Sequence, residues 1–244
     1  VLCTDGDFNV GVTGDALVDE VVSWRERGIT LSVFGYGHGN FNDSFLERLT
    51  NEGEGTYRFI DSPNEALRAV GADLVAGMEV IAKDVKIQVE FAPEQVARFR
   101  LIGYVNRVLA HEDFTNDAVD AGEIGAGHFV TAFYELELAA ERGEGPLATV
   151  RLRHKAPEGG DSIETAHEAA AGLVAETFEM ASADFRFGAA VTEFAEILHH
   201  SEHCDGADFA QVKAIAQGAL DEPTPDRSEL IELVERAAGL WPAE

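Results

Sequence analysis

The sequence predicts an α/β fold, a partial doubly wound parallel sheet, followed by a β-rich antiparallel domain and a C-terminal helical segment. Short apolar strands alternate with amphipathic helices over residues 1–76, which is typical of strand–helix–strand units with right-handed crossovers. From Met78 onward, strands with alternating apolar and polar residues indicate an antiparallel sheet with one solvated face. From Asp184 onward, apolar residues recur with helical spacing. We therefore expect three parts, at residues 1–77, 78–183 and 184–244, with the helices of the last part packed on the β-rich part.

The first part opens on an apolar strand over residues 1–4, which ends at once in a Thr-Asp-Gly turn. A helix is expected over residues 15–27, because its apolar residues form a stripe, Asp15 can cap its start and Gly28 suits the position after its end. The elements that follow are expected to be a strand, a helix, a strand and a helix at residues 29–35, 43–51, 56–60 and 64–76.

Four half-buried strands are expected in the second part, at residues 83–91, 96–104, 129–138 and 148–155. An acidic loop over residues 112–127 lies between them. Residues 162–180 permit two interpretations: their Ala and Glu content favours a helix, whereas residues 162–167 suit a last strand. In the third part, helices are expected at residues 185–199, 209–220 and 227–240, and Pro223 and Pro225 fall in the turn before the last one.

Charge is the strongest global property of the chain. Its 244 residues carry a formal net charge of −27, with 45% hydrophobic and 26% charged residues. This charge would repel duplex DNA and anionic membrane surfaces, and no apolar run approaches the roughly 20 residues that span a bilayer. Because the acidic residues are spread along the chain, we interpret them as a hydrated surface rather than an acidic recognition face. The two cysteines, Cys3 and Cys204, do not suggest a disulfide framework.

Several sequence blocks resemble a known family. The blocks at residues 2–6 (LCTDG), 29–37 (ITLSVFGYG) and 49–57 (LTNEGEGTY) resemble the second half of a von Willebrand factor type A domain. The blocks at residues 82–91, 100–104, 120–128 and 184–191 resemble a bacterial subfamily in which this domain is followed by a C-terminal region of unknown function. The resemblance implies that the chain is the C-terminal part of a longer protein, and it suggests the bacterial cell envelope or periplasm.

The resemblance also implies a metal-ion-dependent adhesion site. In that family an Asp-x-Ser-x-Ser loop, a distant Thr and the Asp of the Thr-Asp-Gly turn hold a divalent cation, usually Mg²⁺, and a carboxylate of the protein partner completes the octahedron. Asp5 matches the third element, with Asp7 as a helper, whereas nothing in the chain matches the first. One or two carboxylates make a poor Mg²⁺ site, so we expect Asp5 to be metal-free in this chain and Mg²⁺ to bind in the intact protein.

Two other clusters suggest metals but permit simpler interpretations. The acidic loop at residues 112–127 lacks the spacing of an EF-hand, so a solvated loop with Asx-turns is favoured over a Ca²⁺ site. His199 and His203 would share one helical face beside Cys204, but zinc needs a fourth ligand. A polar helix end, where His complements the helix dipole, is favoured there.

No enzyme signature is evident in the sequence, such as Gly-x-Ser-x-Gly or a P-loop. We therefore expect a non-enzymatic protein-interaction module with an incomplete metal site. The alternatives are a metal-dependent hydrolase or phosphotransferase that uses Asp5 and Asp7, and a structural assembly module without a metal. Because residues 1–4 should leave an unpaired sheet edge, we also expect a homodimer, or another segment, to cover that edge.

Overall fold

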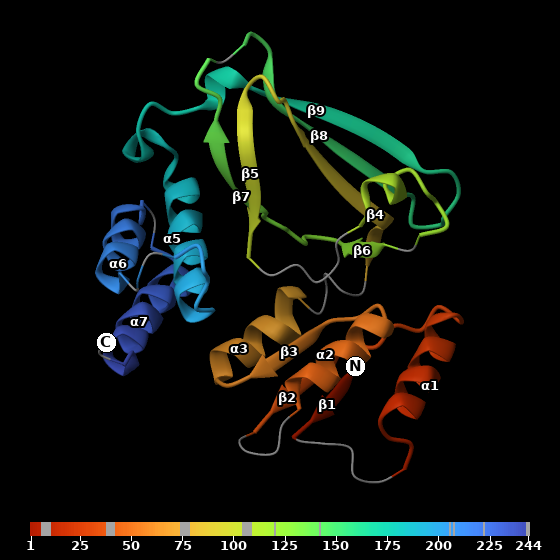
Figure 1. Ribbon diagram of the computed structural model, residues 1–244. Helices are drawn as coiled ribbons and strands as arrows, with labels where there is room; N and C mark the ends of the chain where they lie inside the picture. Colours follow the sequence, from red (N-terminus) through yellow and green to blue (C-terminus); the bar gives the residue numbers. More distant parts are fainter. Residues whose placement is uncertain are drawn as a thin grey trace. The chain divides into compact units, whose positions relative to one another are not determined.

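The structure is a computed structural model that describes residues 1–5, 11–37, 42–73, 79–103, 109–119, 121–141, 143–204, 206, 208–221 and 223–242 (Figure 1). The chain forms two compact units, and each consists of three segments of the sequence. Unit 1 contains residues 1–88, 110–130 and 151–166, and unit 2 contains residues 89–109, 131–150 and 167–244. The expected limits of the three sequence parts stay a prediction.

A three-stranded parallel sheet forms the start of unit 1. Its order is β1 (Leu2–Thr4), β2 (Val33–Tyr36) and β3 (Tyr57–Ile60), so the predicted parallel sheet is confirmed. The crossover helices are α1 (Asp15–Arg25) and α2 (Asp43–Glu52), and β3 is followed by α3 (Pro63–Arg68) and a π-helical turn, η1 (Ala69–Asp73). Val18, Val21 and Leu49 form the buried contact between α1 and α2.

Three details of this region differ from the sequence-based expectation. Gly14, not Asp15, occupies the N-cap of α1, and no side chain caps that helix. The second strand begins at Val33 rather than at residue 29, because the Leu31 amide donates its hydrogen bond to the Gly53 carbonyl in the loop after α2. The apolar strand at residues 1–4 is expected to be buried, yet Cys3 is exposed, since β1 is an edge strand among the described residues.

The β-rich region contains two sheets. The larger sheet has the order β6 (Gly122–Gly125), β4 (Val80–Phe91), β8 (Pro146–Lys155) and β9 (Ile163–Ala170). The smaller sheet pairs β5 (Val96–Ile102) with β7 (Phe133–Leu138). Antiparallel pairing is therefore confirmed for β4 with β6 and for β5 with β7. Strand β6 lies inside the expected acidic loop, and β9 resolves the ambiguity at residues 162–180 in favour of a strand.

The expected alternation along β4 is wrong near its middle. The pairing with β6 shifts register between Ala82 and Val85, and Asp84 adopts a left-handed φ of 50° in the shifted stretch. Such a bulge changes which side chains face inward on the residues that follow it. Lys86 is consequently buried, with 2% of its surface exposed, whereas Ile87 is 58% exposed.

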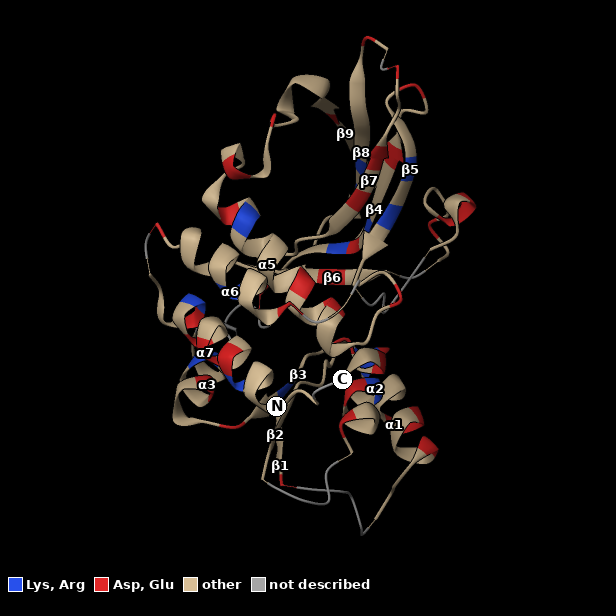
Figure 2. Cartoon of the chain, turned by 60° about the vertical axis from the view of Figure 1, so that its left-hand side comes forward, with Lys and Arg blue, Asp and Glu red and all other residues tan. Residues whose placement is uncertain are grey.

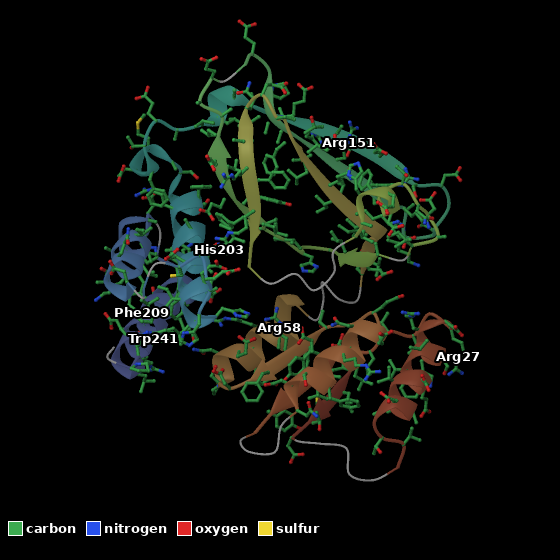
Figure 3. All side chains as sticks on the ribbon, in the orientation of Figure 1. Arg27, Arg58, Arg151, His203, Phe209 and Trp241 are labelled. Atoms are coloured by element: carbon green, nitrogen blue, oxygen red, sulfur yellow. The ribbon has the colours of Figure 1, made fainter. Side chains whose placement is uncertain are left out.

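The C-terminal helices of unit 2 match the helical periodicity of the sequence. They are α5 (Ala183–Leu198), α6 (Phe209–Gly218) and α7 (Pro225–Leu240), and short 3₁₀ turns, η3 (Ala171–Leu173) and η4 (Phe178–Met180), precede them. The side chains of Ser182, Asp208 and Thr224 cap the three helices. A buried cluster joins them, and Figure 3 shows Phe209 and Trp241, which pack edge to face within it. Among the described helices, none is long and apolar enough to cross a membrane.

Candidate functional site

Asp5 lies at the carboxyl end of β1, at the edge of the parallel sheet where α/β proteins commonly bind ligands. The residue is exposed, and Gly37, which follows β2, approaches its backbone closely. Gly37 has a φ of 115°, and a Cβ atom at this position would lie 3.4 Å from the Asp5 carbonyl oxygen. The positive φ, rather than this ordinary contact distance, favours a glycine in the loop after β2.

A second carboxylate, Asp61, follows β3 at the same edge, and the sequence interpretation missed it. Thr4 pairs with Gly35, and Tyr36 pairs with Ile60, so Asp5 and Asp61 extend the first and third strands of the sheet. Two strand spacings separate them, which is about 10 Å and too far for one shared cation. The signal in the sequence was an acidic residue directly after a strand.

The described part of the site does not fit a bound Mg²⁺ by itself. Asp7 lies outside the described residues, so its role as a helper stays a prediction. Within the described ranges, no group of three His, Cys, Asp or Glu side chains is placed to hold a metal ion. Mg²⁺ requires near-octahedral oxygen ligation, and Asp5 offers one carboxylate.

The acidic loop is organised by an internal cation. Lys86 Nζ donates hydrogen bonds to the carbonyl oxygens of Asp113 at 3.3 Å and Asn116 at 2.5 Å. Carbonyl oxygens of this kind are what Ca²⁺ loops use as ligands. Here a buried lysine ammonium contacts them, which supports the solvated-loop interpretation over a Ca²⁺ site.

One carboxylate beside this loop and one within it are also paired with cations. Lys155 Nζ lies 2.5 Å from Asp84 Oδ2, and Arg153 Nη2 contacts both carboxylate oxygens of Asp117, at 3.0 and 3.1 Å. Burial alone would raise the pKa of Asp84, but hydrogen bonds from Lys155 and from the Ala121 amide hold this pKa below its ordinary value. Hydrogen bonds from Ser162 and Arg153 likewise lower the pKa of Asp117.

The histidine cluster in unit 2 is not arranged as the sequence suggests. Helix α5 ends at Leu198, His199 is its C-cap and His200 adopts a left-handed φ of 50°. His199 and His203 therefore do not share a helical face, because the chain has left the helix before His203. Cys204 donates its Sγ hydrogen to the Gly206 carbonyl at 3.0 Å.

A shallow depression of about 350 Å³ in unit 2 is lined by His203 (labelled in Figure 3), Arg100 and Glu196, among other residues. Glu196 Oε2 accepts hydrogen bonds from Arg100 Nη1 at 2.9 Å and from Ser201 Oγ at 2.8 Å. Burial opposes the charge on Glu196, yet these two bonds hold its pKa below the ordinary value. Arg100 and Glu196, two charged groups of the depression, are thus paired with each other.

Comparisons with known proteins place the chain in a family. A family profile described as "Uncharacterized protein YfbK, C-terminal" matches residues 76–240. The chain is also 36% identical, over 260 aligned residues, to the "Uncharacterized protein YfbK" of Escherichia coli (strain K12), and the alignment covers 98% of this chain and 44% of that protein. The chain therefore spans less than half the length of this curated relative.

One solved structure shows a weak structural likeness to the chain. It is described as "von Willebrand factor type A from Catenulispora acidiphila", with a TM-score of 0.44 and 14% sequence identity over 97% of this chain and 57% of that chain. A likeness at this level carries no argument about function. The family profile matches more than half of the chain, and the chain therefore belongs to the family of the C-terminal part of YfbK.

Proposed function

We propose that this chain is part of a non-enzymatic protein-interaction protein, which holds a partner at the carboxyl edge of its parallel sheet through Asp5 and a divalent cation. The observation that carries the proposal is the exposed Asp5 carboxylate at the end of β1. The further oxygen ligands would come from residues outside those described, and the cation would be Mg²⁺, as in the von Willebrand factor A-like sites that the sequence resembles.

The net charge of the chain supports a bridging cation. A partner that offers an acidic side chain would be repelled by a chain of charge −27 unless a cation lay between the two carboxylates. Mg²⁺ suits this role, because it keeps some water ligands that a partner carboxylate can displace.

Calorimetric titration of Mg²⁺ and Mn²⁺ tests the proposal, on this chain and on any longer form of the protein. We expect binding heat in the longer form that the Asp5→Asn substitution abolishes. The matched control is Asp61→Asn, which removes an exposed carboxylate from the same sheet edge and should leave the heat unchanged. No heat in the longer form, or equal loss in both variants, would contradict the proposal.

The same protein preparations also test the alternative that the protein is an enzyme. A metal-dependent hydrolase or phosphotransferase that uses Asp5 and Asp7 would turn over a generic phosphate ester, and the Asp5→Asn substitution would abolish this turnover. We expect no Asp5-dependent turnover.

A second candidate function is assembly through β1, because β1 is the edge strand of the parallel sheet among the described residues. Val1 is 65% exposed, and Cys3 is exposed at the centre of the three-residue strand. In a homodimer with antiparallel β1 strands paired about a two-fold axis, the two Cys3 residues would lie opposite each other, at a separation that suits a disulfide.

Oxidative crosslinking of a Cys204→Ser variant tests this assembly, because Cys3 is then its only thiol. We expect a covalent dimer from this variant and none from the matched Cys3→Ser variant, at both low and high salt. A strictly monomeric species at high concentration, with no Cys3 crosslink, would contradict the homodimer.

A further inference from the structure

The segment between β9 and α5 exposes an unusual run of apolar side chains. Every residue from 172 to 180 is exposed. Leu173 is 75% exposed, Met180 66%, Phe178 39% and Val174 36%. The segment nevertheless has a defined conformation, because turn hydrogen bonds link the Val174 amide to the Ala171 carbonyl and the Met180 amide to the Thr177 carbonyl.

This segment continues onto an aromatic cluster at the start of α5. The rings of Phe178 and Phe185 lie 6.4 Å apart, and those of Phe185 and Phe133 lie 5.7 Å apart. Phe133 of β7 packs directly on Gly188 of α5, where a Cβ atom would lie 2.4 Å from its ring. Phe185 itself is 51% exposed. We call the exposed surface the Phe178 patch, and it consists of Phe178, Met180 and Phe185, which the exposed residues Leu173 and Val174 precede in the sequence.

Acidic residues outnumber basic ones around the Phe178 patch. Residues 167–186 contain four acidic residues and one basic residue, Arg186, whose charge acts on Glu179. Glu176 and Glu179 lie within the exposed segment, and Asp184 pairs with Arg227. A hydrogen bond from the backbone of Glu179 itself, with a second from Thr177, keeps the pKa of Glu179 below its ordinary value. Figure 2 shows the wider pattern, in which acidic residues predominate over basic ones.

We propose that the Phe178 patch binds a basic amphipathic segment of a partner protein. Its apolar side chains would cover Phe178 and Met180, and its Lys or Arg side chains would pair with Glu176 and Glu179. Exposed apolar patches rimmed by charge mark protein interaction sites. The acidic residues around this patch favour a partner segment with basic side chains. A second copy of the chain would bring another −27 charges to the patch, and an anionic membrane would be repelled.

The site requires no cation, so it is independent of the function proposed for Asp5. Binding is therefore measured in EDTA, which separates failure of this proposal from failure of the other. The probe is a synthetic helical peptide of Lys and Leu with one apolar face, labelled for fluorescence anisotropy. Two peptides serve as references: one of Glu and Leu with the same apolar pattern, and one of Lys and Ser without an apolar face.

The decisive variant is the double substitution Phe178→Ser and Met180→Ser. We expect it to weaken Lys/Leu peptide binding by about tenfold or more, because buried apolar anchors dominate such contacts. The matched control is Leu67→Ser with Leu240→Ser, which removes two apolar side chains that are 75% and 85% exposed elsewhere on the chain. This control should bind like the unmodified chain. Equal unfolding temperatures would show that both variants fold.

The charge requirement is tested with Glu176→Gln and Glu179→Gln, which should weaken binding and reduce its dependence on salt. The proposal would be overturned if the Phe178/Met180 variant bound the Lys/Leu peptide as tightly as the unmodified chain does. It would also be overturned if the unmodified chain bound the Glu/Leu or the Lys/Ser peptide as tightly as the Lys/Leu peptide. Adsorption to lipid vesicles that depends on Phe178 and Met180 would instead assign the patch to a membrane. Self-association lost in the same variant would assign it to a second copy of the chain.

Discussion

Lys86 illustrates how one residue organises a loop in this chain. Its ammonium is buried in unit 1 and donates to the carbonyl oxygens of Asp113 and Asn116. A buried charge is tolerated only where hydrogen bonds replace its lost hydration. The loop therefore depends on the lysine as a metal-binding loop depends on its ion.

Substitution of Lys86 by Met should destabilise unit 1 by about 2–4 kcal/mol, because two carbonyl oxygens would lose their donor in a partly buried site. Urea unfolding would measure the free-energy change, and amide exchange should accelerate within residues 111–119. Lys83→Met is the matched control, since Lys83 is exposed on the same strand. An effect of the same size at Lys83 would show that Lys86 has no special role.

Asp84 links stability to pH. Its pKa in the folded chain lies below the ordinary value of about 3.9, although burial opposes this shift, because Lys155 and the Ala121 amide stabilise the carboxylate. A lowered folded pKa contributes stability that is present above the unfolded pKa and is lost as the pH falls through the folded pKa. The stabilisation that the Asp84–Lys155 ion pair provides should therefore be lost only at acidic pH.

We expect the Asp84→Asn variant to be less stable than the unmodified chain near neutral pH and to approach it in stability below about pH 4. Urea unfolding over roughly pH 3 to 7 measures this difference. Asp161→Asn removes an exposed carboxylate and is the control. A difference between the Asp84 variant and the unmodified chain that stays constant over the whole pH range would contradict the linkage.

At the scale of elements, the contact between α5 and β7 depends on a residue without a side chain. Helices normally favour Ala over Gly by about 0.5–1 kcal/mol. Gly188 lies inside α5, yet a Cβ atom there would overlap the Phe133 ring at 2.4 Å. Packing against β7, rather than helix propensity, therefore explains the glycine.

Gly188→Ala should destabilise unit 2 by about 1–3 kcal/mol through this overlap. In a Phe133→Ala background the same substitution should become neutral or stabilising, because the helix preference for Ala then acts alone. Thermal unfolding of the unmodified chain, the two single variants and the double variant completes a double-mutant cycle, which measures the coupling between Gly188 and Phe133. Gly239→Ala in α7, where nothing lies within 4 Å of the new Cβ, should be mildly stabilising. Additive effects at Gly188 and Phe133 would contradict the contact.

At the scale of the whole molecule, charge repulsion opposes folding. The sequence has 45 acidic and 18 basic residues, so unscreened repulsion among carboxylates is large. Salt screens exposed charges over about 10 Å at 0.1 M and about 3 Å at 1 M.

We expect 1 M NaCl to raise the unfolding temperature by about 3 °C or more relative to low salt, because the lost repulsion exceeds the weakened surface ion pairs. Calorimetry at matched pH measures the shift, and KCl should act equally, since screening is not specific to one cation. An unfolding temperature that falls with salt would indicate that the surface ion pairs dominate instead.

The sequence alone determined the succession of elements over residues 1–76 and in the C-terminal helices. Apolar periodicity identified the three C-terminal helices, because helix formation depends on contacts within a few residues, and the structure adds the caps Ser182 and Asp208. The strand–helix alternation likewise predicted the parallel sheet, and Asp5 was placed correctly at the end of its first strand.

Only the tertiary structure decided what depends on contacts distant in sequence. The bulge at Asp84 turned Lys86 inward, and residues 163–170 became a strand although their composition favours a helix, because pairing with β8 outweighs local propensity. The sequence likewise did not show that the Phe178 patch is exposed or that Asp61 and Asp5 lie at the same edge of the parallel sheet. Exposure and proximity are properties of the folded chain, since they arise from residues that the sequence separates and packing brings together.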